Sequence, residues 1–197
     1  MSDKRTTYTI GAIVAAFVLV FGLVAGSTSL TTMSVSSVDP MQMSGHVIIT
    51  LADPDGNIIA YRQTDNLVTH DGKDCSADLL FGTSTELCGS TASTFEFIAI
   101  GSGFTSLTES DAALETEITL TAGRQGTLIS EVGATVTGPA VKTFEGVFTL
   151  GDTQTVNEVG LFDAAPLGNM FSKLQINPPI TANVDDVITI TYVLKVG

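Results

Sequence analysis

Tryptophan is absent from this chain of 197 residues, and histidine and cysteine occur only twice each. Sugar-binding sites usually contain exposed aromatic side chains, and a chain with no tryptophan and three tyrosines offers few of them. His70 lies beside Asp71 and Asp74, but one histidine among loop carboxylates is more typical of a solvated turn than of a metal site. No Gly-x-Ser-x-Gly nucleophile motif occurs either. The sequence therefore predicts a noncatalytic protein.

Basic residues are also scarce, since 8 lysines and arginines stand against 21 acidic residues and give a net charge of −13. Such a chain repels nucleic-acid phosphates and anionic lipid headgroups, which excludes nucleic acid as an expected partner. The long polar side chains that cover surface helices are few, whereas threonine, valine, isoleucine and glycine are plentiful. With 44% hydrophobic residues, we expect one β-rich domain with a real core.

The N-terminus carries a targeting segment. Residues 10–25 contain no charge and follow the basic pair Lys4 and Arg5. The small residues at 24–27 fit a cleaved signal peptide, whereas a retained transmembrane anchor would keep the N-terminus inside the cell. A pilin-like leader is a third interpretation, which Thr6 weakens because a small residue is expected there. We therefore assign residues 1–26 to a signal peptide or transmembrane anchor and expect an extracellular or cell-surface location, with membrane contact through residues 10–25 if they are retained.

The two cysteines, Cys75 and Cys88, agree with export. Twelve residues separate them, and glycine, serine and threonine residues lie near them. A disulfide between them would close a surface loop and stabilise the fold by about 3 kcal/mol on loop-entropy grounds. The alternative is a pair of free thiols. Because they form no CxxC motif, a redox function is not expected.

Residues 27–44 form a Ser/Thr-rich segment whose only charge is Asp39. This composition is typical of a linker, but its β-branched residues also suit an extended strand. Such a strand could add to the sheet of a neighbouring subunit, with main-chain hydrogen bonds supplying affinity. Its apolar side chains would then fill pockets of the acceptor: Leu30, Met33, Val35 and Val38.

From residue 45 onward, apolar residues recur with a period of two, which indicates strands. A strand at 46–52 and its return at 58–62 flank the turn at 53–57, where proline and glycine favour a hairpin. Further strands are expected at 95–100, 116–120, 127–136, 141–150, 187–196 and in the two halves of 158–176. This pattern predicts that residues 45–197 form an all-β domain, an antiparallel β-sandwich of jelly-roll-like or immunoglobulin-like type, with a barrel as the alternative.

One or two short helices are expected within this domain, behind the N-terminal hydrophobic helix. Residues 77–81 precede Gly82, which suits a helix C-terminus. Ser106 and Glu109 have the spacing of a capping box, which predicts a second short helix at residues 110–115.

Calcium is the one cofactor for which the sequence offers a candidate. Asp53, Asp55 and Asn57 place oxygen-bearing side chains at alternate positions, as a calcium loop begins. The downstream bidentate glutamate is missing, and the glycine comes too early. The segment therefore fits a plain hairpin turn better, and Asp163, in the loop within 158–176, is likewise expected to be a turn carboxylate.

Three stretches together resemble a β-rich module of phage and prokaryotic-virus tail or virion proteins. They are "DPDGNIIAYRQTDNLVTHDGKD", "FEFIAIGSGFTSLTESDAALETEI" followed by Arg124, and "TFEGVFTLGDTQTVNEVGLFDAAPLGNMFSKLQINPPITANVDDVITITYVLKV". The resemblance covers about residues 45–197 and implies a building block of a capsid, tail or filament, with no catalytic residue to carry over. The export segment and the cysteine pair depart from that pattern and point to the cell surface.

The function expected from these features is that of a noncatalytic extracytoplasmic structural or adhesive subunit. It would associate with copies of itself into a homopolymer, such as a surface filament or tube, by strand addition of residues 27–44. Two alternatives remain at this point. One is a virion or tail structural protein of a prokaryotic virus, and the other is a membrane-anchored ligand-binding β-module.

Overall fold

The computed structural model describes residues 42–81, 94–135 and 138–197, all within the compact unit Met41–Gly197. The predicted targeting segment and most of the predicted arm therefore lie outside the described residues. Within the described residues, no helix is both long and apolar enough to cross a membrane.

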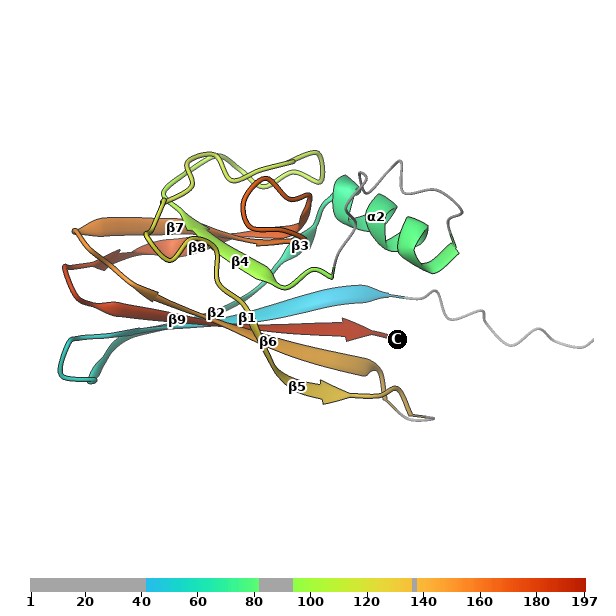
Figure 1. The fold of residues 1–197 in the computed structure, drawn as a ribbon, viewed down its shortest axis with the longest axis horizontal. Coiled ribbons are helices and arrows are strands. Elements are labelled where there is room, and N and C mark those ends of the chain that lie inside the picture. The colour runs from blue at the N-terminus through green and yellow to red at the C-terminus, as the bar shows by residue number, and fades with distance from the viewer. Residues whose placement is uncertain (1–41, 82–93, 136–137) are drawn as a thin grey trace, which may run out of the picture. The chain divides into compact units, whose positions relative to one another are not determined.

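The described residues form nine strands and one helix (Figure 1). In chain order they are β1 Met43–Ala52, β2 Ile58–Asp65, β3 Leu67–Val68, α2 His70–Phe81, β4 Phe97–Gly101, β5 Thr127–Val132, β6 Ala140–Thr149, β7 Gln154–Phe162, β8 Met170–Ala182 and β9 Val187–Val196.

The strands form two sheets whose inner faces enclose the main core. Sheet A has the order β2-β1-β9-β6-β5 and sheet B the order β3-β8-β7-β4, and every pair of neighbours is antiparallel. The core combines apolar side chains of both sheets, such as Ile49 and Ile190 from sheet A with Val159 and Leu174 from sheet B. The predicted all-β antiparallel sandwich is thus confirmed.

Strand β9 lies at the centre of sheet A, between β1 and β6, and has the bounds expected from its alternation. Ile188, Ile190 and Tyr192 point into the core and are fully buried. Inside the sandwich, the Tyr192 hydroxyl hydrogen-bonds the Ser172 hydroxyl of β8 at 2.8 Å. Burial raises the pKa of the Tyr192 phenol, although the Ser172 bond opposes this, so the group stays neutral and links the two sheets.

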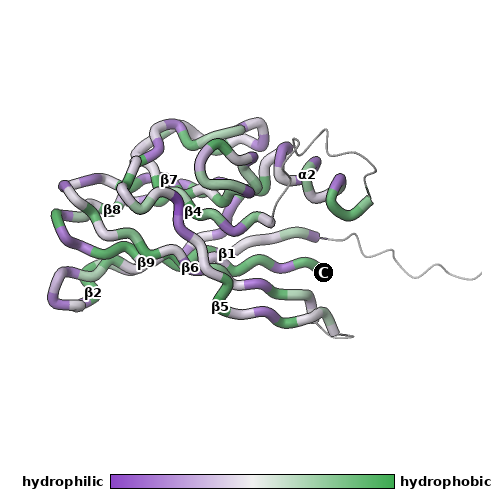
Figure 2. Tube along the Cα trace, viewed as in Figure 1, coloured by the Kyte–Doolittle hydropathy of each residue, from purple (hydrophilic) through white to green (hydrophobic). Residues whose placement is uncertain are grey.

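The helix α2 is longer than expected because it begins at His70 rather than near Ala77. The preceding Thr69 caps it, since its hydroxyl accepts a hydrogen bond from the Gly72 N–H at 3.0 Å. Gly72 allows the helix to approach β8 closely, because a Cβ there would collide with the Phe171 carbonyl oxygen. Figure 2 shows the apolar C-terminal end of the helix, where Phe81 is exposed.

The second expected helix, at residues 110–115, does not form. Residues 102–116 instead make an irregular loop, called here the covering loop because it lies over the outer face of sheet B. The Glu109 carboxylate, which would have closed the capping box, binds Lys73 of α2 at 2.8 Å. The Glu115 carboxylate accepts the N–H groups of Phe104 and Thr105 at 2.6 and 2.8 Å. These tertiary contacts outweigh the local helical signal.

The strand expected at 116–120 is likewise not formed as a regular strand. The segment runs beside β4 and makes a single isolated bridge, between Gly101 and Glu117. The Ile118 N–H donates to the Ile100 carbonyl at 2.9 Å, and further along the Gln125 and Ile98 backbones exchange hydrogen bonds. Segment 116–125 therefore covers the outer edge of β4.

Candidate functional site

The outer face of sheet B contains a buried cluster of charges. Glu158 of β7 and Lys173 of β8 are 2% and 3% exposed, and the Lys173 Nζ lies 3.0 Å from a Glu158 carboxylate oxygen. The same ammonium is 3.3 Å from Asp111 of the covering loop. The Glu158 carboxylate also accepts backbone N–H groups of the loop, from Gly103 at 3.1 Å, Glu115 at 3.1 Å and Thr116 at 2.9 Å.

This cluster anchors the covering loop. Burying charges is costly unless they are paired and hydrogen-bonded, and here the lysine and three backbone donors satisfy Glu158. Burial tends to raise the pKa of Asp111, but hydrogen bonds from Thr108 and the charge of Lys173 outweigh it and hold that pKa below its usual range. A second apolar cluster, which includes Leu114 and Phe162, seals the same face. The charged groups of Glu158, Lys173 and Asp111 thus hold the covering loop on the outer face of sheet B.

Arg124 connects segment 116–125 to the β7–β8 hairpin. Its guanidinium donates two hydrogen bonds of 2.9 Å to the Glu117 carboxylate and one to the Ala164 carbonyl. It also stacks over the Phe162 ring, 3.6 Å from the ring centre. In that hairpin the Asp163 carboxylate accepts the Asn169 backbone N–H at 2.7 Å, which confirms Asp163 as a turn carboxylate.

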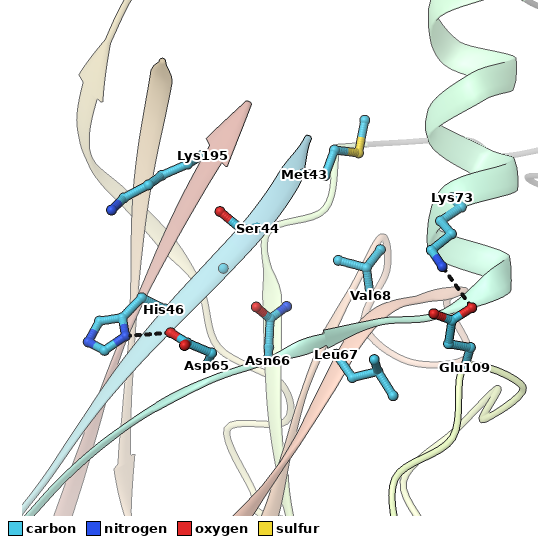
Figure 3. Close-up of a pocket in the computed structure, with 11 residues that line it drawn as sticks. Met43, Ser44, His46, Asp65, Asn66, Leu67, Val68, Lys73, Glu109 and Lys195 are labelled. Atoms are coloured by element: carbon cyan, nitrogen blue, oxygen red, sulfur yellow. Dashed lines mark hydrogen bonds and ion pairs between the residues drawn. The ribbon is translucent and has the colours of Figure 1, made fainter. Parts of the chain in front are cut away.

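A cavity of about 470 Å³ opens where β1, β2 and β3 approach α2 (Figure 3). Figure 3 shows His46 and Asp65 on one side of this cavity and Lys73 and Glu109 on the other. His46 Nδ1 lies 2.9 Å from the Asp65 carboxylate. The Lys73 ammonium, followed by His70, holds the pKa of the Glu109 carboxyl below its usual range. The charges at this cavity are therefore mostly paired with each other rather than presented to a ligand.

The candidate calcium ligands lie in the β1–β2 turn. Asp53 accepts the backbone N–H groups of Asp55 at 3.0 Å and Asn57 at 2.8 Å, and Gly56 has a φ of 86°. Hydrogen bonds from the side chain and then the backbone of Asn57 lower the pKa of the Asp53 carboxyl. The described ranges contain no group of three or more His, Cys, Asp or Glu side chains that could hold a metal. The hairpin is confirmed, and calcium binding stays a prediction.

Most of the other predicted site residues lie outside the described residues. Cys75 is fully buried on α2, whereas Cys88 lies outside the described residues, so their pairing stays a prediction. The four apolar residues of the predicted arm also lie outside them: Leu30, Met33, Val35 and Val38.

Sequence reasoning did not single out the edges of sheet A, where backbone groups are unpaired. All six residues of β5 are exposed, among them Leu128 at 43%, Ile129 at 50% and Val132 at 53%. β5 pairs with β6, and no other strand of the described ranges pairs with its opposite side. The available signal was the lack of alternation in "TLISEV", which does not fit a half-buried strand.

Comparison of the chain with family models, with curated proteins and with solved structures finds no match. The fold and site define a two-sheet antiparallel sandwich with a covered sheet and an open-edged sheet. The resemblance to a virion module stays a prediction.

Proposed function

We propose that this protein is a noncatalytic structural subunit that assembles with copies of itself outside the cytoplasm. The part of the predicted arm 27–44 that precedes Gln42 in one copy would act as a donor strand for the sheet of another. The observation that carries this proposal is the open edge of sheet A, where β5 offers unpaired backbone groups along an apolar strand. Such an edge is a template for pairing with another chain.

The position of the arm supports this use. Met43 and Ser44, assigned to the arm from sequence, are the first residues of β1 and pair with β9. The Gln42 and Gly197 backbones still exchange two hydrogen bonds, of 2.8 and 3.2 Å. The arm therefore joins the domain through β1, which is extended and held between β2 and β9.

Charge also favours an arm as the contact between copies. Two subunits of net charge −13 repel each other. An arm with Asp39 as its one charge brings little of this repulsion into the interface. Backbone hydrogen bonds then supply affinity, and apolar arm residues supply specificity.

Export through residues 1–26, with membrane attachment through residues 10–25 if they are retained, is the proposed route to the cell surface. A basic pair before an uncharged apolar segment supports it. The predicted Cys75–Cys88 disulfide would suit the oxidising compartment reached in this way.

The test compares the full chain with a variant that replaces the apolar arm residues by serine: Leu30→Ser, Met33→Ser, Val35→Ser and Val38→Ser. Each is produced by its native export route and examined by sedimentation, negative-stain imaging and intact mass, which also reports cleavage and the disulfide. We expect polymers of the unaltered chain and dispersed subunits of the variant. A wild-type chain that stays monomeric at high concentration, or a variant that polymerises equally well, contradicts the proposal.

A further inference from the structure

We infer that the free edge of β5 is the acceptor site for the arm, and that the arm comes from a second copy in an antiparallel, head-to-tail arrangement. This inference rests on the proposed function and specifies which surface of the domain receives residues 27–44.

The four sheet edges differ in how they are covered. In sheet B, segment 116–125 bonds to the edge of β4, and β3 covers part of the β8 edge while Pro178 and Pro179 lie further along that strand. Proline lacks the N–H that a pairing strand needs. In sheet A, the two outermost strands are β2 and β5. The choice of acceptor therefore lies between these two.

The direction of each backbone group follows from the pairing of Gln42 with Gly197. In antiparallel sheets, residues alternate between pointing their N–H and C=O to one neighbour and to the other. The Gln42–Gly197 exchange fixes this alternation across β1, β9 and β6. It follows that Ser130 and Val132 bond to β6, whereas the N–H and C=O of Glu131 face the free edge.

The β2 edge is already partly blocked by a side chain. The same alternation directs the backbone groups of Tyr61 and Gln63 to the free side of β2. The Tyr61 carbonyl there accepts a hydrogen bond of 2.8 Å from the guanidinium of Arg62. Among the described residues, no side chain bonds to the β5 backbone in this way, so β5 presents the more available edge.

Side-chain packing also favours β5. Its residue Leu128 pairs with Phe144, which is buried in the core, yet Leu128 is 43% exposed. The inner face of sheet A is therefore incompletely covered at this position. An added strand with apolar side chains would extend the core over Leu128 and bury it.

Strand direction gives the arrangement of the copies. β5 runs antiparallel to β1, because three antiparallel pairings separate them. An arm pairing antiparallel to the acceptor's β5 therefore runs in the direction of the acceptor's β1. Since the arm continues into the donor's own β1, donor and acceptor would be oriented alike, one beyond the other. A heterologous contact of this kind generates a filament when the rotation between successive copies does not close a ring.

The subunit's own arm suits this edge less well. The fifteen residues 27–41, if extended, span about 50 Å, which is enough to fold back from the start of β1 to β5. An arm that folds back would run parallel to β5, however, and parallel pairing is slightly weaker per residue. We therefore take a second copy, whose arm can pair antiparallel, as the donor.

The first test uses a proline whose ring blocks only the free edge. Glu131→Pro removes the outward N–H and leaves the bonds from β5 to β6 intact. Glu131→Gln is the matched control, because it removes the same charge and its 3.7 Å pairing with Lys142 but keeps the N–H. Gln63→Pro blocks the β2 edge in the same way. In the full chain, we expect Glu131→Pro alone to abolish sedimentable polymer, with circular dichroism unchanged in all three variants.

The second test does not depend on how well the proline variant folds. Full-length copies carrying Ser130→Cys are mixed with copies carrying one arm cysteine at position 33, 34, 35 or 36 in turn, and cross-linked peptides are identified by mass spectrometry. We expect disulfides between copies for at least one arm position, and weaker or no cross-linking when Gln63→Cys replaces Ser130→Cys.

The outcomes separate the two proposals. If the unaltered chain polymerises through its arm but cross-links to position 63, or if folded Glu131→Pro still polymerises, the β5 inference is overturned and the proposed function stands. If arm and β5 cysteines join only within one copy, the second-copy donor is wrong. If the unaltered chain never polymerises, the proposed function itself fails.

Discussion

Sheet A and sheet B of this sandwich differ in how far their edge strands and outer faces are covered by other parts of the chain. In sheet B, the covering loop buries the outer face around Glu158 and Lys173, and segment 116–125 covers the β4 edge. In sheet A, β5 is exposed along its whole length. Natural sheets usually protect their edges against unwanted pairing. The contrast is between a sheet whose outer face and β4 edge are covered and a sheet whose β5 edge is open, as the proposed donor-strand contact requires.

The largest effect is expected from breaking the anchor of the covering loop. Lys173→Met leaves Glu158 and Asp111 without their buried cation, so we expect a loss of about 3–5 kcal/mol in the free energy of unfolding, measured in urea. A double variant, Lys173→Met with Glu158→Gln, removes both charges and should lose less than the single variant. Equal stability of Lys173→Met and the unaltered chain would show that the pair does not hold the loop.

A smaller loss of stability is expected where segment 116–125 runs beside β4. Gly126 follows this segment directly, and Gly126→Ala would place a Cβ against the carbonyl oxygen of Glu96, the residue before β4. This should force the segment from the β4 edge and lower the free energy of unfolding, measured by heat or urea, by about 1–3 kcal/mol. Gly133→Ala, which follows β5, meets no atom within 4 Å. Its effect should stay within about 0.5 kcal/mol. Similar losses for both would remove the difference between the two sheets.

Acid should weaken the covering loop at one carboxylate in particular. Backbone N–H bonds from Thr105 and then Phe104 lower the pKa of Glu115 below its ordinary 4.5. A carboxyl whose pKa is lower in the folded state than in the unfolded state stabilises the fold fully at pH values above the unfolded-state pKa. This stabilisation is lost as the pH falls through the folded-state pKa. We expect Glu115→Gln to flatten the decline of unfolding free energy between about pH 5 and pH 3. An unchanged slope would show that these bonds do not stabilise the loop.

The smallest effect on folding is expected at the open edge. Leu128→Ser should change the stability of the dispersed domain by no more than about 0.5 kcal/mol, because its side chain is already 43% exposed. The same change should weaken assembly, measured as the concentration at which polymer appears. A large loss of stability in the dispersed domain would mean that Leu128 belongs to the core.

Much of the fold follows from period-two alternation. The bounds of β9 and the hairpin around Gly56 agree with the sequence, because both depend on local signals. The prediction of a helix at residues 110–115 was wrong, because Glu109 binds Lys73 of α2. No local sequence pattern indicates this contact. The buried outer face of β7 was missed for the same reason. Glu158 is typical of a solvated position until a distant loop covers it.

The candidate site was only partly predictable. Composition alone distinguishes residues 27–44 as a candidate donor strand. The proposed acceptor depends on which strand ends the sheet and on where Glu131 points its backbone, and both follow from sheet order and register. These are long-range properties, since β5 is placed by β6 and, through it, by β9 and β1.

The most direct test is amide hydrogen exchange of the peptide covering residues 127–132. It is measured in assembled full-length protein and in the four-serine arm variant. If the arm pairs with β5, this peptide is slow to exchange in the assembly and faster in the variant, while peptides of β2 exchange alike in both. Equal exchange of residues 127–132 in assembled and dispersed protein would contradict the proposed donor-strand contact.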